Sequence, residues 1–259
     1  MTVKSKKKKF TLINAFQIAT LAALLIYMQI AVKSGAVSKV FLAAPTDIVA
    51  EGIKIITNGT LLPHFLVSIE EILVGYTLAA VMGIGLGIIW TLFPKTEEFG
   101  NVFCSAIMAV PKVAILPLLI LWFGIGFLSK VVLIFLFAVF TILYNTVTGA
   151  KQCKESYLKV ARVFEANRFQ TVFQVVIPSA LPSIFNGLRL AAATAFTGVV
   201  FSEMQSAKAG VGYLLSEAQG LLNTPRVFFL IVLITVMSVI FVKIISLIEY
   251  AVCHKWRRV

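Results

Sequence analysis

Few side chains in this sequence have the types and spacing that catalysis or metal binding requires. The cysteines Cys104, Cys153 and Cys253 are isolated from one another, and the histidines His64 and His254 lie far from them. Such spacing predicts neither a disulfide framework nor a zinc site. There is no serine, histidine and aspartate arrangement, and no glycine-rich phosphate loop. We therefore expect no catalytic residue, no metal and no cofactor bound by this chain.

Three polar residues stand inside long apolar segments and are the candidates for a transport path: Lys112, Asn145 and Glu203. A charge in the middle of such a segment costs about 3 kcal/mol on membrane-insertion scales. Lys112 either attracts an anionic solute or reaches water or a partner where the segment breaks between Pro111 and Pro117. Asn145 is expected to hydrogen-bond between helices. Glu203 either lines a gate or holds helices together.

The elements that must position these residues are membrane helices. Of the 259 residues, 59% are hydrophobic and only 13% are charged, and the mean hydropathy is +0.97. Such a chain cannot hide its apolar surface by folding in water, so we expect it in a lipid bilayer. The excess of 23 Lys and Arg over 11 Asp and Glu lies mostly between apolar segments. It indicates topology and no nucleic-acid partner.

About 20 apolar residues in a helix cross the hydrocarbon core of a bilayer. Six segments meet this length: 10–32, 66–93, 101–123, 131–150, 183–204 and 227–251. Before the fifth segment, Pro178 and Pro182 predict a short surface helix that ends ahead of the span. Basic residues gather on the side of the amino terminus, which predicts that both termini are cytosolic. The sequence thus predicts an all-α polytopic protein, with a basic stretch over 1–9 and a transmembrane domain over 10–255.

A short helix is also expected on the outer face, beginning near Pro45. Thr46 or Asp47 would cap its amino end, because their side-chain oxygens can accept from free backbone N–H groups. The pair Asn58 and Gly59 would end it.

Small residues recur every four positions in the second and fifth predicted spans. The first row is Gly75, Ala79, Gly83 and Gly87, and the second is Gly187, Ala191 and Ala195. Small residues let helices approach closely in lipid, where packing replaces the hydrophobic effect as the associating force. We therefore expect both helices to be buried in a bundle.

The longest cytosolic segment, 150–182, resembles the coupling loop of ABC importer permeases. The pattern of that loop is Glu-Ala-Ala, three residues, Gly, nine residues, Ile, one residue, Leu, Pro. Ala161 and Pro178 match it, whereas Lys159 replaces its glutamate and Glu165 replaces its glycine. The resemblance covers about residues 41–255. It includes LPLLILWFGIGFLSK, IPSALPSIFNGLRLA and FSEM, which look like the permeases of the nitrate, sulfonate and taurine importer group.

What the resemblance implies is a six-helix type I ABC importer permease (MetI-like) bundle, whose loop docks on an ATPase. An apolar docking face would comprise Tyr157, Leu158, Ala161, Phe164, Ala166 and Phe169, with a charged rim of Lys159, Arg162 and Arg168. The alternative is an amphipathic helix that lies on lipid headgroups. Because Glu165 disfavours positive φ, we predict that the family's chain reversal moves to Asn167 or is lost.

The resemblance also implies the partners and the place of the chain. These are a cytosolic ABC ATPase that binds ATP, an extracytoplasmic binding protein and a second permease copy as a homodimer. The resemblance further implies a location in the bacterial cytoplasmic membrane, and nitrate, a sulfonate, taurine or a pyrimidine vitamin precursor as the expected solute. One alternative is a secondary transporter half or small carrier without an ATPase, and another is a membrane enzyme or scaffold.

Overall fold

The computed structural model describes residues 12–206 and 208–253. The basic stretch 1–9 and the basic carboxyl-terminal residues, which entered the topology prediction, lie outside the described residues. Within these ranges the chain is helical and has no β-strand, so the all-α prediction is confirmed. The elements are α1 (Leu12–Lys33), α2 (Pro45–Thr57), α3 (Leu61–Leu92), α4 (Pro94–Ala109), α5 (Lys112–Phe123), α6 (Phe127–Lys151), α7 (Glu155–Val163), α8 (Arg168–Thr171), the π-helical turn η1 (Val172–Val176), α9 (Ile177–Ser206), α10 (Val211–Gly220) and α11 (Thr224–Cys253).

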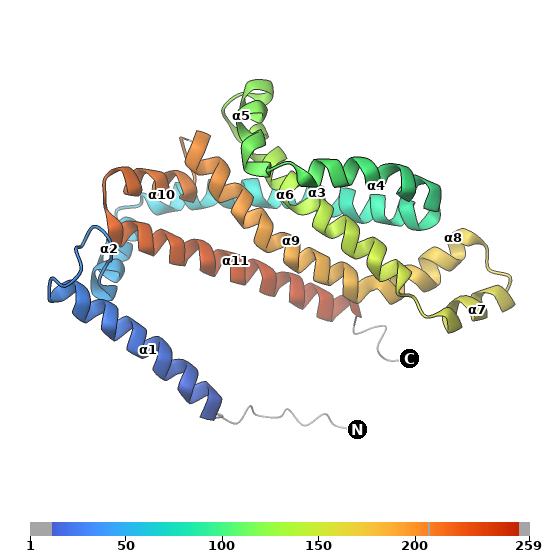
Figure 1. Cartoon of the computed structure of the whole chain (residues 1–259), viewed down its shortest axis with the longest axis horizontal. Helices are drawn as coiled ribbons and strands as arrows, with labels where there is room; N and C mark the ends of the chain where they lie inside the picture. The colour runs from blue at the N-terminus through green and yellow to red at the C-terminus, as the bar shows by residue number, and fades with distance from the viewer. Residues whose placement is uncertain (1–11, 207, 254–259) are drawn as a thin grey trace.

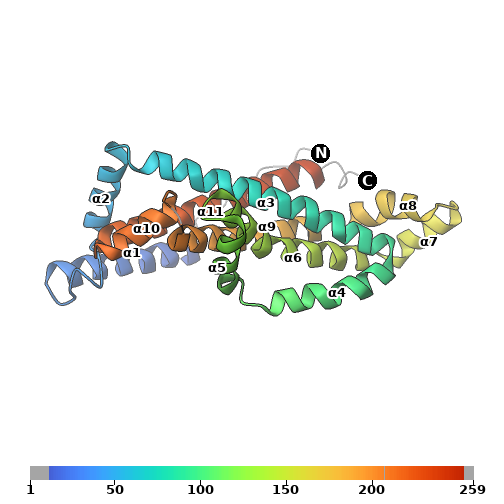
Figure 2. The same ribbon diagram turned by 90° about the horizontal axis from the view of Figure 1, so that it is seen from above.

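The long helices α3, α6, α9 and α11 form an elongated bundle (Figures 1 and 2). Helices α2 and α10 lie at one end of the bundle, and α7 and α8 lie at the other (Figure 1). By length and apolar composition, five of the described helices can cross a bilayer, and α4 with α5 adds a sixth crossing if the bent pair is one span. This arrangement places the two ends of the bundle on opposite sides of a membrane.

Helix α6 is the centre of the bundle, with α3 and α9 packed against it. Its residues Leu133, Ile134, Ala138 and Ile142 have no exposed surface. In the most apolar part of α6, 56% of the residues are buried, compared with 11% in α1. The core of the protein therefore lies along α6.

The rows of small residues lie at the contacts of α6. A Cβ atom on Gly83 would lie 2.8 Å from the carbonyl oxygen of Val139, and one on Gly187 would lie 2.5 Å from the Cβ atom of Asn145. Ala79, Ala191 and Ala195 have no exposed surface. The small side chains thus let the backbones of α3 and α9 approach α6 closely.

The segment that the sequence predicts as one span over 101–123 contains two helices. Helix α4 ends at Ala109, α5 begins at Lys112, and their axes are bent by 95°. Val110 and Pro111 are both extended, as expected of a proline and the residue before it. Hydropathy alone does not predict the break between α4 and α5.

At Pro178 and Pro182 the sequence predicts an interruption, but the structure has a continuous helix. The turn η1 runs directly into α9, which contains both prolines. A π-helical turn shifts the backbone hydrogen bonds by one residue just before Pro178, whose nitrogen has no hydrogen to donate. The chain therefore passes through both prolines as one helix.

Helix α2 forms where the sequence predicts a short helix, but its cap differs. The N-cap residue is Ala44, Pro45 occupies the first turn, and no side chain caps the end. Proline suits this position because its missing N–H would have no helical partner. The predicted end is confirmed, because Asn58 is the C-cap and Gly59 has a φ of 75°.

An ion pair joins α2 to the start of α11. Glu51 Oε1 accepts from Arg226 Nε at 2.9 Å and from Asn223 Nδ2 at 3.3 Å. Burial of the Glu51 carboxyl group opposes ionisation, but the Arg226 hydrogen bond and charge outweigh it and lower the pKa of Glu51 below its usual value. Nearby, Thr224 Oγ1 donates to the carbonyl oxygen of Val40 at 2.7 Å. These contacts fix the loops at this end of the bundle.

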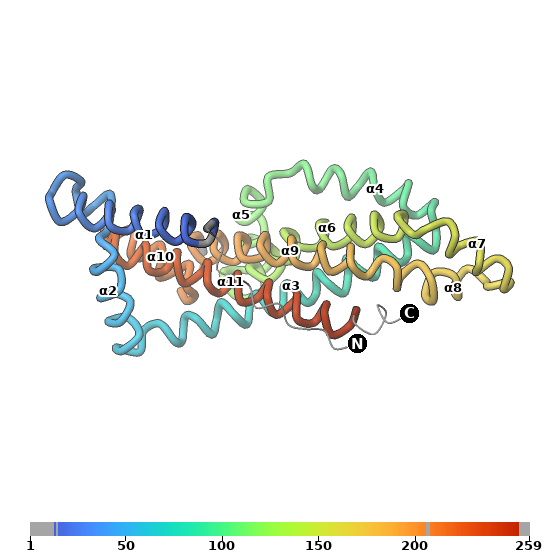
Figure 3. The backbone as a smooth tube through the Cα atoms, turned by 90° about the horizontal axis from the view of Figure 1, so that it is seen from below, coloured from blue at the N-terminus to red at the C-terminus, as the bar shows by residue number. Residues whose placement is uncertain are grey.

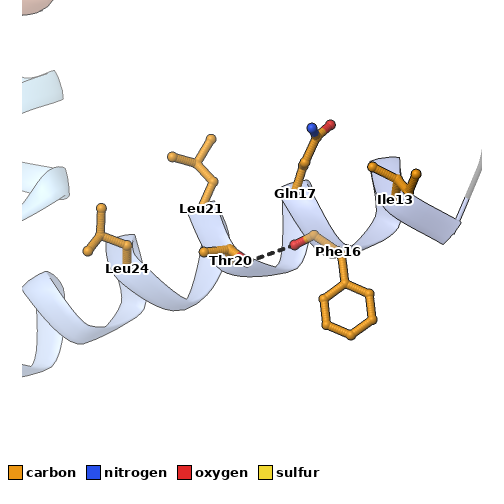
Figure 4. A pocket seen from close by; sticks show the side chains of 6 residues that line it. All are labelled: Ile13, Phe16, Gln17, Thr20, Leu21 and Leu24. Carbon is orange, nitrogen blue, oxygen red and sulfur yellow. Dashed lines mark hydrogen bonds between the residues drawn. The ribbon is translucent and has the colours of Figure 1, made fainter.

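Helix α1 packs against α2 and otherwise stands apart from the bundle in Figure 1. Figure 3 shows the chain leading from the carboxyl end of α1 to α2. One part of its surface carries a shallow, mainly apolar pocket (Figure 4), lined by Ile13, Phe16, Gln17, Thr20, Leu21 and Leu24. An apolar helix with so little burial needs lipid or another protein surface around it.

Candidate functional site

The α7–α8 loop (residues 152–176) carries an exposed apolar surface at one tip of the bundle (Figure 1). Val163 and Phe164 are each 80% exposed, and Tyr157 and Val160 are about half exposed. Ala161, which lies between Tyr157 and Phe164 on the same helix face, is buried. An exposed short helix that projects apolar side chains is suited to insertion into a groove of a partner.

The predicted docking residues divide into three groups in the structure. Tyr157, Phe164 and Phe169 are exposed, together with the rim residues Lys159, Arg162 and Arg168. Leu158 and Ala166 are half-buried, and Ala161 faces inward. Val160 and Val163 were not predicted, although the spacing of three residues from Tyr157 to Val160 and on to Val163 indicated one helix face.

The chain reversal after α7 occurs at Glu165, so the prediction that it moves to Asn167 was wrong. Glu165 has a φ of 52° and lies in the left-handed region. The Glu165 N–H donates to the carbonyl oxygen of Arg162, and the Ala166 N–H donates to that of Ala161, both at 3.0 Å. This pair of bonds is the Schellman motif, which satisfies helix-terminal carbonyl groups and offsets the strain of a non-glycine residue.

Asn167 instead begins the next helix. Its side chain accepts from the Gln170 backbone N–H at 2.9 Å, and the Gln170 side chain accepts from the Asn167 N–H at 2.8 Å. This reciprocal pair is a capping box. The reversal at Glu165 and the cap at Asn167 together fix the angle between α7 and α8.

A hollow of about 610 Å³ separates α7 from the segment that leads into α9. Tyr157, Ala161 and Phe164 line one wall, and Gln174 and Pro178 line the other. The matched residues Ala161 and Pro178 therefore both border this hollow. The exposed edge of α7 and the start of α9 form one continuous surface.

The three candidate path residues do not come together in the structure, and each contacts different residues. Lys112 begins α5, is half-buried, and its ammonium nitrogen lies 5.6 Å from the centre of the Phe137 ring on α6. Asn145 donates to the carbonyl oxygen of Thr141 at 2.8 Å and accepts from Asn186 on α9 at 3.4 Å. Asn145 thus bonds across two helices, in the manner predicted for it.

Glu203 lies near the end of α9, where only 1% of its surface is exposed. It accepts from Ser68 Oγ on α3 and from the Gly212 N–H on α10, both at 2.6 Å. A side chain so enclosed is unlike the lining of an open path. Of the two alternatives for Glu203, this geometry favours holding helices together.

Comparison with known proteins identifies the family. A family model described as "Binding-protein-dependent transport system inner membrane component" matches residues 83–258. The chain belongs to this family. The resemblance seen in the sequence is thereby confirmed, and the permease is a multi-pass membrane protein and a transport subunit.

Several relatives of this permease have named transport roles. It is 34% identical over 223 residues to the putative aliphatic sulfonates transport permease SsuC of Bacillus subtilis, covering 86% of this chain and 80% of that one. It is 31% identical to the riboflavin transport system permease RibX of Chloroflexus aurantiacus, covering 89% and 86%. It is 29% identical to the taurine transport system permease TauC of Escherichia coli, covering 85% and 82%. These relatives place the permease in the predicted sulfonate and taurine group.

Solved structures share its fold. An inward-facing form of the MetNI methionine ABC transporter superposes with a TM-score of 0.64 at 17% identity, covering 74% of this chain and 95% of that one. An amino acid ABC transporter with histidines superposes with a TM-score of 0.62 at 15% identity, covering 77% and 97%. The predicted permease bundle is therefore confirmed as the fold.

Proposed function

We propose that two copies of this permease form a symmetric pair in the bacterial cytoplasmic membrane. A cytosolic ABC ATPase binds each α7–α8 loop, and an extracytoplasmic binding protein delivers the solute to the opposite end. ATP binds to the ATPase, and this chain holds no cofactor. Both termini then lie in the cytosol, because the amino end of α1 and the carboxyl end of α11 both point away from the end of the bundle where α2 and α10 lie (Figure 1).

The observation that carries this proposal is the exposed apolar edge of α7. Phe164 and Val163 project from a helix that is largely exposed, and the Schellman motif holds the following turn rigid. Burial of an exposed phenylalanine or valine side chain contributes about 1.5–3 kcal/mol. Lys159 and Arg162 would surround this contact with positive charge. The α7 edge thus supplies both affinity and orientation for an ATPase.

The experiment is co-purification of the permease with its ATPase in detergent. Phe164→Asp and Val163→Asp place a charge in the proposed contact, and we expect both to lose the ATPase. Gln152→Asp adds the same charge at an exposed position before α7 and should retain it. Ala161→Asp is less informative, because Ala161 is buried and the change would disturb the loop itself. Retention of the ATPase by both α7 variants would remove the coupling assignment.

The solute that we propose is a small sulfonate such as taurine. Named relatives include permeases for aliphatic sulfonates and for taurine, and one for riboflavin. Uptake of labelled taurine, an alkanesulfonate, nitrate and riboflavin can be compared in vesicles that contain the permease, its ATPase and its binding protein. ATP-dependent uptake of riboflavin alone would overturn the choice of a sulfonate.

We propose that Lys112 stabilises the break between α4 and α5 and does not bind the solute. Its ammonium group faces the Phe137 ring, and such a contact contributes about 0.5–2 kcal/mol. Lys112→Met should therefore lower thermal stability while anion uptake survives in the variants that fold. Loss of uptake at unchanged stability would instead place Lys112 in the solute path.

A further inference from the structure

Four buried polar side chains meet where α3, α6 and α9 come together beneath α10. This carboxyl cluster consists of Ser68 and Glu71 on α3, Lys130 on α6 and Glu203 on α9, and each is at most 4% exposed. Glu71 Oε1 forms an ion pair with the Lys130 ammonium group. Ser68 Oγ, one turn from Glu71, donates to Glu203 Oε1 at 2.6 Å. The Glu71 and Glu203 side chains lie within hydrogen-bonding reach of each other.

Glu203 holds the amino end of α10 in place. Its Oε2 accepts from the Gly212 N–H at 2.6 Å, while the Val211 N–H donates to Ser68 Oγ at 2.9 Å. Gly210 has a φ of 120°, and a side chain at Gly210 or Gly212 would collide with Glu203. The carboxyl group therefore occupies the position at which a helix amino terminus binds an anion.

The charges of the cluster do not balance when every group is ionised. Glu71 and Glu203 would carry two negative charges and Lys130 one positive charge. A buried charge without a partner is costly, and two adjacent carboxylates disfavour their joint ionisation. Within the described part of the chain, Glu71 Oε2 is buried and has no hydrogen-bond partner. A carboxylate oxygen in that position lacks the hydrogen atom that would satisfy it.

Within residues 12–206 and 208–253, no other group that faces the cluster supplies the missing positive charge. Glu70, which precedes Glu71 on α3, is exposed and adds a negative charge. His64 accepts from the Gly210 N–H through Nδ1 at 3.0 Å, so this nitrogen carries no proton. From α10, Tyr213 stacks on the His64 ring. Among the residues that the structure describes, Lys130 is the only cation of the cluster, and its ion pair is with Glu71.

We propose that Glu71 and Glu203 share one proton, located between Glu71 Oε2 and the Glu203 carboxyl group. The cluster is then neutral, every buried oxygen of the pair has a partner, and Glu203 remains an acceptor for α10. The ligand is a proton that is taken up from water as the bundle forms. Its loss would leave two repelling carboxylates beneath α10 and would weaken the attachment of that helix.

Infrared spectroscopy of the purified permease in lipid tests the proposal directly. A protonated carboxyl group gives a carbonyl stretch that is separate from the carboxylate bands and shifts in deuterated water. We expect this band in the wild type at neutral pH. Raising the pH of the same sample should remove it and increase carboxylate absorption. Its absence from the wild type at neutral pH would overturn the proposal.

Three variants locate the proton. Glu71→Gln and Glu203→Gln each leave one carboxylate and the Lys130 charge in the cluster, so both should lose the band. Glu70→Gln, the matched control at the neighbouring exposed position, should keep it. Glu71→Gln should also melt close to the wild type, because glutamine resembles a protonated carboxyl group. A band that persists in both cluster variants lies elsewhere, and loss in only one variant places the proton on that group alone. Either result would overturn the shared arrangement.

Discussion

The close contact between α3 and α6 predicts different effects of substitution at two glycines that lie two residues apart in α3. A Cβ atom on Gly83 would lie 2.8 Å from the carbonyl oxygen of Val139 and 3.0 Å from the Cβ atom of Ile142. Nothing lies within 4 Å of a Cβ atom on Gly85. Gly83→Ala therefore forces α3 away from α6, whereas Gly85→Ala meets open space.

The expected magnitudes follow from two opposing effects. Replacing glycine by alanine inside a helix stabilises it by about 0.8–1 kcal/mol. Overpacking a close contact costs about 1–3 kcal/mol. The obstacle at Gly83 includes a backbone oxygen, which cannot rotate away, so the cost should fall in the upper half of that range. We expect Gly85→Ala to be neutral or stabilising, and Gly83→Ala to be destabilising by about 1–2 kcal/mol.

Thermal unfolding of both variants in the same detergent and in lipid measures the difference. Gly85→Ala serves as the matched control, because the change in composition and helix propensity is the same. Gly83→Ala should have the lower melting temperature in both environments. Equal stability, or a more stable Gly83→Ala, would refute the close approach of α3 to α6.

Three further changes test other parts of the fold. Glu165→Gly should stabilise the α7–α8 loop by about 1 kcal/mol, because glycine removes the cost of the left-handed conformation; slower hydrogen exchange in α7 would show this, and faster exchange would contradict it. Arg189→Met should lower the melting temperature more than the double variant Arg189→Met/Glu249→Met, because the single change leaves one member of their ion pair without its partner; an equally unstable double variant would count against the pair. The lowered pKa of Glu51 means that its bond to Arg226 contributes stability above a pH of about 4.5, which is lost as the pH falls through the folded-state value. The difference in melting temperature between the wild type and Glu51→Gln should therefore shrink in acid, and a constant difference would contradict the assignment.

Features that depend on local composition could be predicted from the sequence. Apolar length located the helices, and Asn58 with Gly59 located the end of α2 because both residues suit a turn. The small-residue rows could be found because close helix packing in lipid requires small residues at a regular spacing. They lie at the contacts of α6. The α7–α8 loop was located by its charge and by its likeness to a known pattern.

Features that depend on competing or distant contacts were missed. The cost of positive φ at Glu165 was correctly recognised, but the two hydrogen bonds that offset it form only when the loop closes. The π-helical turn before Pro178 has no comparable signal in composition. Ser68 and Glu203 are separated by 135 positions, so their contact follows from the packing of α3 on α9. The sequence identified Glu203 as unusual but could not supply its partners.

Helix α9 connects the two functional ends of the permease. Its 30 residues extend about 45 Å, from the end of the α7–α8 loop to the region of Glu203 beneath α10. Gly187, Ala191 and Ala195 hold it against α6 along this length, so α9 cannot slide without carrying α6. A displacement imposed on the loop would therefore move the central helices together, and we expect them to shift against α10, which is attached to α9 through Glu203. A disulfide that fixes α10 to α3 should accordingly impair transport while leaving ATPase binding intact, and unimpaired transport by the cross-linked protein would show that α10 moves with the bundle.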